Sequence, residues 1–471
     1  MTPSPKKPVR VRFPPSPTGP INLGNVRTAL FNWLFAKHEG GEFMLRIEDT
    51  DKTRSEKRYE KGILDGLKWL GISWDNKKII RQSERIPLYK KYLERLLIKN
   101  AAYYCFCSAE ELDLERQAQL SQGLQPKYSG KCKHLLTEEV NKNLAESKPA
   151  VIRFKTPVKE GWFHDIVRGK VPYNGNLIGD IIIAKGLEEP LYNFAVVIDD
   201  EEMGITHVIR GEDHLSNTPK QIFLIEALGF GMPEYAHLPL ILGPDRKKLS
   251  KRFLDASLDD YIRAGYLKDA MINFLALLGW HPKEDREVIS IPDMIKEFTL
   301  SRVQKSGAVF NPEKLDWLNS LYIKEMGNSK LLSLLKPFIP VSWQKQKKLL
   351  LNVLEVEKPR LKKLSEFEEL AKFFFVPENY SSELLIWKNT TKDATKSNLE
   401  ATLKILENLK KPEDAEEAIA RLANERGRGE VFWPLRAALS GRNASPGPIE
   451  IINIVGVSEA SARVQSAIEK L

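Results

Sequence analysis

The chain has 471 residues, of which 42% are hydrophobic and 29% charged, a composition that is ordinary for a folded protein and excludes an intrinsically disordered one. At roughly 150 residues per domain, this length predicts about three domains. The net charge of +9 fits a phosphate-rich partner, although many basic proteins bind no nucleic acid. Apolar runs fall far short of the ~20 residues that span a bilayer, and no secretory signal is present, so we expect a soluble, cytoplasmic protein.

The first fifty residues alternate between extended and helical patterns. Residues 9–13 predict a short strand, and the prolines of residues 14–20 then enforce a loop. Helical spacing of the large side chains in residues 26–37 predicts a helix, which a glycine pair ends. Residues 43–47 alternate as a strand would. We therefore expect two parallel strands of one sheet, with a ligand bound where the loop and Glu48 follow the strands' carboxyl ends.

Residues 101–189 interrupt this alternation with cysteines and a polar run, and we interpret them as an inserted domain. After them the apolar pattern predicts strands at residues 192–199, 204–210 and 237–242. These strands are expected to complete the sheet that the first segment begins.

A further helix is predicted to begin at Thr218-Pro219, with threonine as the N-cap, and to end at Gly229. From about Asp255 the chain is predicted to be helical to its end, because apolar residues such as Phe274 and Leu278 recur at helical spacing.

The loop after the first strand enters the predicted helix through Asn22-Leu23-Gly24-Asn25. Free N–H groups and the helix dipole favour an anion at such a point, so the segment predicts a phosphate site. The alternative is a plain proline-rich turn.

A basic run follows a turn at residues 243–245 and contains Lys247, Lys248, Lys251 and Arg252. Cationic side chains stabilise the charge that develops on leaving phosphates. The alternative is a solvated surface loop.

The cysteines form a spaced pattern, with Cys105-x-Cys107 followed after 24 residues by Cys132-x-His134. Two close pairs of soft or borderline ligands can close a tetrahedral zinc site. The alternative is three buried thiols and a surface histidine. Because four ligands leave no open position, the predicted zinc is structural.

Several long motifs resemble those of bacterial glutamyl-tRNA synthetases, a class I aminoacyl-tRNA synthetase family. They are the run from Val11 to Asp51 with its Arg46-Ile47-Glu48-Asp49, the segments 192–197 and 204–214, and Lys248-Leu249-Ser250-Lys251-Arg252, which resembles the family's Lys-Met-Ser-Lys-Ser loop. The resemblance implies ATP-dependent attachment of glutamate to tRNA(Glu) through a glutamyl adenylate.

The resemblance also implies an α/β fold with a Rossmann-like parallel-sheet catalytic domain at residues 1–100 and 190–255. An α+β acceptor-binding insertion with the zinc would occupy residues 101–189. An all-α connector would follow at 256–330 and a helical anticodon-binding region at 331–471. The expected cofactors are ATP as a substrate, Mg²⁺ and one structural Zn²⁺, and the expected state is a monomer that binds tRNA(Glu) and glutamate and no membrane.

The residues that the resemblance assigns fall into four groups. Those implied for catalysis are Asn22, Gly24, Lys248, Ser250 and Lys251. Those implied for glutamate are Arg12, Ser16, Glu48, Tyr192 and Arg210, with Glu48 on the ammonium, the two arginines on the carboxylates, and Arg12 on that of the side chain. Those implied for ATP are Thr18, Gly24 and Lys251. Those implied for the anticodon are Arg360 and Arg436.

Two positions depart from the family pattern: Asn22 stands where histidine is usual, and Pro14 where alanine is usual. Asparagine can donate a hydrogen bond to a phosphate but cannot carry a proton charge. One alternative is therefore a tRNA-binding relic without catalysis. Others are an enzyme that also charges tRNA(Gln), and a paralogue that glutamylates a modified tRNA base, although such paralogues lack the anticodon region.

Overall fold

The structure is a computed structural model that describes residues 8–51, 53–247, 257–409 and 411–471. It forms two compact units, one made of Met1–Tyr261 with Met271–Pro312 and the other of Ile262–Ala270 with Glu313–Leu471. Among the described residues, none of the helices combines the length and the apolar character needed to span a bilayer.

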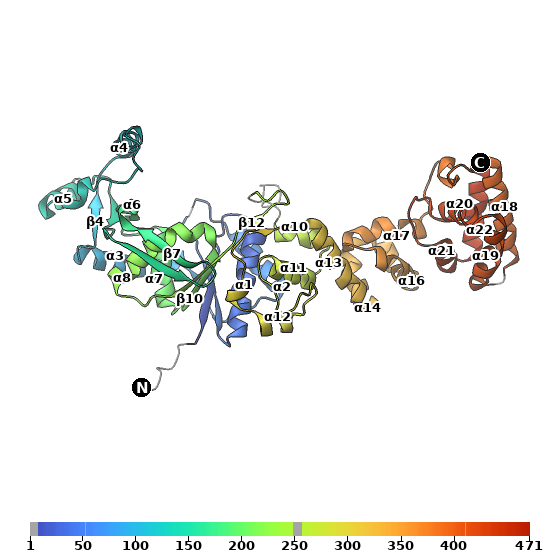
Figure 1. Cartoon of the computed structure of the whole chain (residues 1–471), viewed down its shortest axis with the longest axis horizontal. Coiled ribbons are helices and arrows are strands. Elements are labelled where there is room, and N and C mark those ends of the chain that lie inside the picture. The colour runs from blue at the N-terminus through green and yellow to red at the C-terminus, as the bar shows by residue number, and fades with distance from the viewer. Residues whose placement is uncertain (1–7, 52, 248–256, 410) are drawn as a thin grey trace. The chain divides into compact units, whose positions relative to one another are not determined.

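The first unit begins with the predicted strand, loop, helix and strand. Strand β1 (Arg10–Phe13) pairs in parallel with β2 (Glu42–Ile47), and α1 (Leu23–His38) connects them (Figure 1). The short strand β3 (Ile80–Arg81) extends this parallel sheet beyond β2. Helices α2 (Lys57–Leu70) and α3 (Ile86–Ile98) follow β2 and β3 along the chain. The predicted parallel pair is confirmed.

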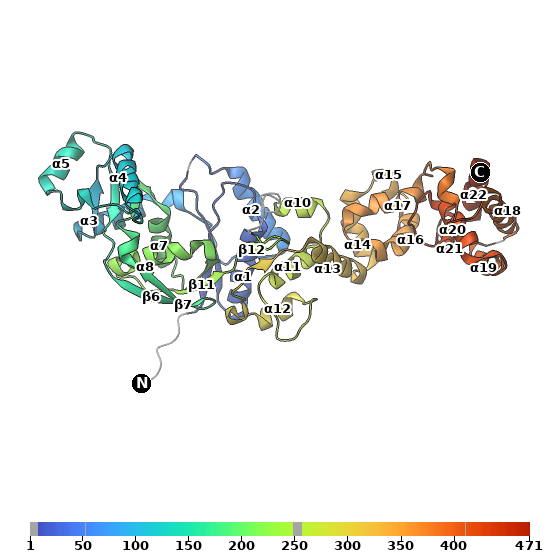
Figure 2. The same ribbon diagram turned by 45° about the horizontal axis from the view of Figure 1, so that its top comes forward.

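A second sheet continues the first at β1. Its order is β10 (His207–Gly211), β11 (Glu234–Leu238), β6 (Glu160–Asp165) and β7 (Gly169–Asn174), and only β7 is antiparallel to its neighbour. The backbone N–H of Thr206 donates to the carbonyl of Arg10 at 2.9 Å, so β10 lies beside β1. Figure 2 shows β6, β7 and β11 side by side. Two strands of the predicted insertion therefore belong to this sheet.

The rest of the predicted insertion forms its own antiparallel sheet. The strand order is β4 (Ala102–Cys105), β5 (Val151–Phe154), β8 (Ile182–Gly186) and β9 (Glu189–Pro190). The helices of this segment are α4 (Ala109–Ser121), α5 (Thr137–Ala145) and α6 (Gly175–Ile178).

The prediction of a strand at residues 192–199 is wrong, because this segment is the helix α7 (Tyr192–Glu202). Its central residues from Phe194 to Ile198 are all apolar and all buried, so the helix is buried on every side. A short continuous apolar run of this kind has no helical periodicity and cannot be told from a buried strand.

Two other predictions need correction. Helix α8 (Thr218–Leu228) ends at Gly229 as expected, but Thr218 is its first residue, and its hydroxyl contacts other side chains instead of capping the helix. The strand predicted at 237–242 divides into the end of β11 and a separate β12 (Ile241–Leu242), because Pro239 lacks the N–H that a ladder needs.

The segment predicted to be helical from Asp255 onward is largely so. In the first unit α12 (Ile291–Glu297) packs on α1, while β13 (Ala308–Val309) is an exception that pairs in parallel with β12. Helices α10 (Leu258–Arg263) and α11 (Lys268–Leu277) contain residues of both units.

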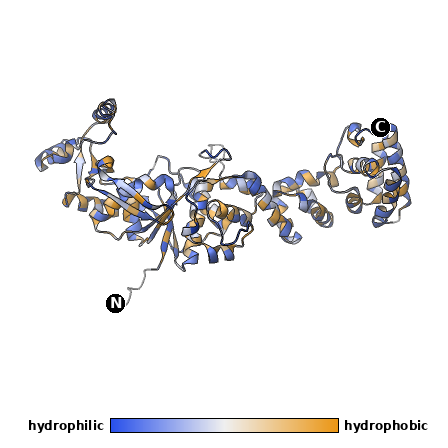
Figure 3. Ribbon diagram, viewed as in Figure 1, coloured by the Kyte–Doolittle hydropathy of each residue, from blue (hydrophilic) through white to orange (hydrophobic). Residues whose placement is uncertain are grey.

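The described residues of the second unit form helices around one apolar core that includes Leu354, Phe367, Leu399, Leu435 and Val464. Apolar and polar residues alternate along these helices, as expected when one face of a helix packs on others (Figure 3). The main helices are α13 (Pro312–Glu325), α14 (Asn328–Leu335), α15 (Val341–Gln344), α16 (Lys347–Glu357), α17 (Phe367–Phe375), α18 (Lys392–Asn408), α19 (Ala415–Arg426), α20 (Arg428–Ser440), α21 (Pro448–Val455) and α22 (Val457–Lys470).

Candidate active site and metal cluster

A cavity of about 620 Å³ opens at the carboxyl ends of β1 and β10 and at the N-terminus of α1. This is the end of a parallel sheet at which ligands bind. Its lining brings together eight of the predicted site residues: Arg12, Ser16, Thr18, Asn22, Gly24, Glu48, Tyr192 and Arg210. The other three predicted catalytic residues, Lys248, Ser250 and Lys251, lie outside the described residues.

Arg12 is held rigidly beside the cavity by an acidic residue that the sequence did not single out. Its Nε donates to Asp200 Oδ1 at 3.1 Å and its Nη2 to Oδ2 at 3.2 Å. Its Nη1 is buried and has no hydrogen-bond partner among the residues that the structure describes. One nitrogen of this guanidinium is therefore unpaired beside the cavity.

Beneath Glu48 lies Arg46, which is completely buried. Its guanidinium contacts Glu48 at 3.1 Å, Asp200 at 2.7 Å and Asp199 at 3.6 Å. Burial raises the pKa of Glu48, and the nearby charges of Arg46 and Arg12 only partly offset this rise. A cationic ligand group beside Glu48 would favour its carboxylate form. Arg46 thus holds Glu48 in place. In the sequence, the only signal of this role is that Arg46 belongs to the same Arg-Ile-Glu-Asp motif as Glu48.

Arg210 shows the same pattern as Arg12. Its Nε donates to His237 and its Nη2 to Thr218, and its Nη1 is buried without a partner in the described part of the chain. Next to it, the hydroxyl of Tyr192 lies 3.0 Å from Nδ1 of His214. Arg12 and Arg210 therefore line the cavity together with the carboxylate of Glu48, and each arginine has one nitrogen without a partner among the described residues.

The N-terminus of α1 lines the cavity as well. Asn22 is its N-cap, and the side-chain oxygen accepts from the backbone N–H of Asn25 at 2.9 Å. Because the oxygen is occupied, the amide nitrogen is the part of Asn22 that is left to donate to a ligand. The first turn of α1 contains no acidic residue, so the positive end of the helix dipole is not offset there.

A second cavity, of about 690 Å³, adjoins the first and shares Ser16, Thr18, Glu48 and Tyr192 with it. Its outer wall includes Lys185 of β8 and other residues of the predicted insertion. A ligand in the second cavity can thus approach one in the first.

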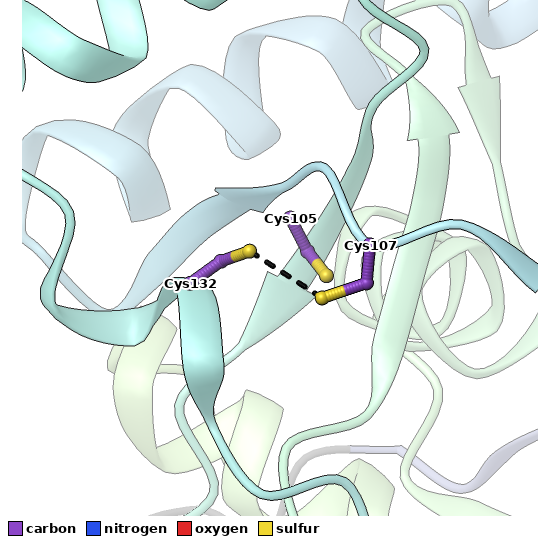
Figure 4. A group of neighbouring side chains, drawn as sticks. All are labelled: Cys105, Cys107 and Cys132. Atoms are coloured by element: carbon purple, nitrogen blue, oxygen red, sulfur yellow. Dashed lines mark hydrogen bonds between the residues drawn. The ribbon is translucent and has the colours of Figure 1, made fainter. Parts of the chain in front are cut away.

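The three cysteines come together as predicted, with all three sulfurs within 4.8 Å of one another (Figure 4). The Sγ atoms of Cys107 and Cys132 are 3.6 Å apart. Tetrahedral zinc with Zn–S bonds of about 2.3 Å requires a sulfur–sulfur separation of roughly 3.8 Å, so the cluster fits the metal.

His134 ends the 3-10 turn Lys131–His134, and its ring is not part of this group of ligand atoms. The hydroxyl of Tyr128 lies instead 3.4 Å from Cys105 Sγ and 3.5 Å from Cys107 Sγ. Tyr128 is not among the residues predicted from the sequence, although it lies only four residues before Cys132.

The two predicted anticodon residues lie together in the second unit. Arg360 donates to the carbonyl of Ala444 at 3.0 Å, and Arg436 donates to that of the preceding Asn443 at 2.8 Å. Arg360 also pairs at 2.7 Å with Glu357, which is fully buried. Arg436 lies over the ring of Trp433, 4.6 Å from its centroid. Two cations from different helical segments thus contact neighbouring carbonyls of one loop, and Arg436 lies beside an aromatic ring.

Comparison with known proteins agrees with this geometry. Residues 8–317 match the family model described as "tRNA synthetases class I (E and Q), catalytic domain", and residues 330–468 match "Anticodon binding domain". Relatives named Glutamate--tRNA ligase from Carboxydothermus hydrogenoformans and Aquifex aeolicus are each 44% identical to the chain, over 97% and 98% of it and 99% of their own length.

A solved structure of a glutamate tRNA ligase from Elizabethkingia meningosepticum, in complex with its amino acid, superposes with a TM-score of 0.89. It is 37% identical, and the match covers 99% of this chain and all of that one. The resemblance seen in the motifs thus extends over both units and every described element of the cavity. The chain belongs to the glutamate–tRNA ligase family of class I aminoacyl-tRNA synthetases.

Proposed function

We propose that the protein attaches glutamate to tRNA(Glu) at the expense of ATP, through a glutamyl-adenylate intermediate. The observation that carries the proposal is the cavity lined by Arg12, Arg210 and the carboxylate of Glu48, in which each arginine has one nitrogen that no described residue engages. Glutamate has two carboxylates and one ammonium, and arginine is well suited to carboxylates. Arg12 would bind the side-chain carboxylate, Arg210 the other, and Glu48 the ammonium.

ATP would place its phosphates at the N-terminus of α1, near Thr18, Asn22 and Gly24. An oxygen of the glutamate carboxylate attacks the α-phosphorus, and pyrophosphate leaves. Lys248 and Lys251, with Ser250 holding their loop, would stabilise the leaving charge. Mg²⁺, which accompanies ATP in such reactions, would neutralise part of the phosphate charge.

The second step would transfer glutamate to the terminal ribose of tRNA, and the adjoining cavity supports this because it shares Glu48 and Tyr192 with the first. The insertion of residues 101–189 would hold the acceptor end. The helical region of residues 331–471 would bind the anticodon through Arg360 and Arg436. Discrimination against tRNA(Gln) would depend on Arg360.

We also propose one structural zinc per chain, held by Cys105, Cys107 and Cys132. Two residues compete for the fourth position: His134, which the spacing of the motif suggests, and Tyr128, whose hydroxyl already contacts two of the sulfurs. The metal would stabilise the fold of the insertion at the small cluster in which Cys105 and Cys132 pack with Tyr103.

Aminoacylation with radiolabelled glutamate tests the proposal, with purified tRNA(Glu) and tRNA(Gln) as separate substrates. Charging of tRNA(Glu) alone supports it, and charging of both would favour the enzyme with wider tRNA choice. Binding of tRNA without charging of either would favour the relic. Lys251→Ala should lower glutamate-dependent pyrophosphate exchange by ~10²-fold or more, the scale for one charge-stabilising donor. An unchanged rate would remove Lys251 from the mechanism.

A further inference from the structure

Behind Arg210 lies a buried chain of polar side chains that the proposed reaction does not yet use. Arg210 on β10 and His237 on β11 are register partners, and Asp165 ends the next strand, β6. Arg210 Nε lies 3.2 Å from His237 Nε2, and His237 Nδ1 lies 2.6 Å from Asp165 Oδ2. His237 and Asp165 are both fully buried, so water does not compete for these contacts.

The partners of Asp165 fix its charge. Its carboxylate accepts backbone N–H groups from Val167 at 3.0 Å, Arg168 at 2.7 Å and His237 at 3.0 Å. Burial alone would raise the pKa of Asp165, but the hydrogen bonds from the His237 ring and the Arg168 backbone outweigh it, and the pKa is lowered. Asp165 is therefore an anion that only accepts hydrogen bonds.

That charge in turn fixes the tautomer of His237. Burial lowers the pKa of His237, which favours the neutral ring. In the neutral ring only one nitrogen carries hydrogen, and it must be Nδ1, because Asp165 can only accept. Nε2 then presents its lone pair to the Nε–H of Arg210 at 3.2 Å and to the hydroxyl of Thr218 at 3.0 Å. A carboxylate that orients a histidine in this way is a recurrent arrangement in functional sites.

Both fixed nitrogens of Arg210 thus face neutral acceptors, since Nη2 donates to Thr218 Oγ1 at 2.8 Å. Arg12 differs, because its Nε and Nη2 both contact the carboxylate of Asp200. The charge of Arg210 is not cancelled by a directly bound anion, whereas that of Arg12 is partly cancelled. Of the two Nη1 atoms that lack a partner among the described residues, the one on Arg210 belongs to the cation that forms no ion pair with those residues.

We propose that His237, held in one tautomer by Asp165, is a positioning residue that fixes the guanidinium of Arg210 for a carboxylate of glutamate. This inference rests on the proposed function, since it takes Arg210 to contact the amino acid. It assigns a task to Asp165, a residue of the inserted segment that lies outside the cavity lining.

Two substitutions of His237 separate its two hydrogen bonds. The amide of asparagine reaches only the place of Nδ1, so His237→Asn keeps a donor for Asp165 and leaves Arg210 Nε without an acceptor. The longer His237→Gln brings an amide oxygen to the place of Nε2 and restores that acceptor. We expect His237→Asn to raise the KM for glutamate about tenfold or more, the scale of one hydrogen bond to a charged group. His237→Gln should recover most of this loss, and the KM for ATP should hardly change in either variant.

Asp165→Asn is an isosteric second test. The amide oxygen would accept the backbone N–H groups of Val167 and Arg168, which turns the amide nitrogen towards His237. The ring would then carry hydrogen on Nε2, facing Arg210, and the KM for glutamate should rise as in His237→Asn. In a His237→Gln background the same change should have little further effect, because the tautomer no longer matters.

Calorimetric titration with glutamate, run beside the aminoacylation assay, keeps the outcomes distinct. If the parent binds glutamate but charges no tRNA, the proposed function fails, and the affinities of the variants still decide the role of His237. A purely structural role predicts equal loss of thermal stability in His237→Asn and His237→Gln without any difference in glutamate KM. That result, or parental glutamate binding in His237→Asn and Asp165→Asn, would overturn the inference, as would a parent that binds no glutamate.

Discussion

Asp200→Asn should destabilise the first unit strongly, although it changes almost no volume. Asp200 contacts both Arg12 at 3.1 Å and Arg46 at 2.7 Å. Arg46 retains Glu48 and Asp199 after the change, but Arg12 forms no other ion pair among the described residues. Removing one partner from a buried pair costs about 3–5 kcal/mol. Because the Asp200 side chain is 13% exposed and the amide oxygen still accepts a hydrogen bond, we expect about 3 kcal/mol.

The effect should also depend on pH. Burial would raise the pKa of Asp200, but the charges of Arg12 and Arg46 outweigh it, so the pKa lies below its usual value. A carboxylate with a lowered pKa stabilises the fold above its unfolded-state pKa and loses that contribution as pH falls. The difference between parent and variant should therefore be complete at pH 7 and shrink below about pH 4.

Urea unfolding at pH 7 measures the loss, with peptide-resolved hydrogen exchange to identify the transition of the unit that contains β1. The matched control is Asp65→Asn, which removes an exposed pair with Lys61 at 2.6 Å in the same unit. We expect no shift in its unfolding midpoint, because exposed pairs contribute little. Equal midpoints for the Asp200 and Asp65 variants would refute the reasoning that the buried cluster depends on Asp200.

Three further outcomes are expected. Asn22→Ala should slow glutamate-dependent pyrophosphate exchange by ~10²-fold, because the side-chain amide that could donate to a phosphate is lost. The rate of Asn22→His should equal that of the parent or exceed it by up to ~10-fold. An alanine variant with the parental rate would exclude the amide of Asn22 as a phosphate contact. Elemental analysis after mild chelation should find less zinc in Tyr128→Phe than in His134→Ala, and the reverse order would restore the histidine as the fourth ligand. Burial raises the pKa of Glu357 to about 7, so the folded second unit retains a proton that the unfolded chain releases, and its unfolding free energy should fall from about pH 5 to 8. Glu357→Gln should flatten this slope, and an unaltered slope would assign it to other groups.

The first strand, loop, helix and strand could be predicted because each has a local cause: prolines in the loop, helical spacing of large side chains, and a glycine pair at the end. The parallel pairing of β1 with β2 then follows from the connecting helix. The helix α7 could not be predicted in this way, since its buried residues surround it on all sides and erase the periodicity.

The residues of the candidate site also fall into those that local sequence predicts and those that it does not. Residues inside a recognisable motif, such as Arg12, Glu48 and Arg210, could be placed from the sequence, and the cavity brings them together. The residues that hold these side chains in position could not be predicted from the sequence. Asp200 follows an apolar run misread as a strand, and Asp165 is some seventy residues from His237 and reaches it only through the pairing of β6 with β11. Such contacts are properties of the tertiary fold.

The hairpin of β6 and β7 has a consequence for anyone who would exchange parts between members of this family. A graft that replaced residues 101–189 as one block would also remove two strands of the catalytic sheet, together with the carboxylate of Asp165. An exchange limited to residues 106–150 would leave both sheets complete, because that stretch contains the helices α4 and α5 together with Cys107 and Cys132 but no strand, while Cys105 stays at the end of β4. The segment that can be exchanged is thus the stretch between β4 and β5, whereas the β6–β7 hairpin has to come from the same protein as the catalytic core.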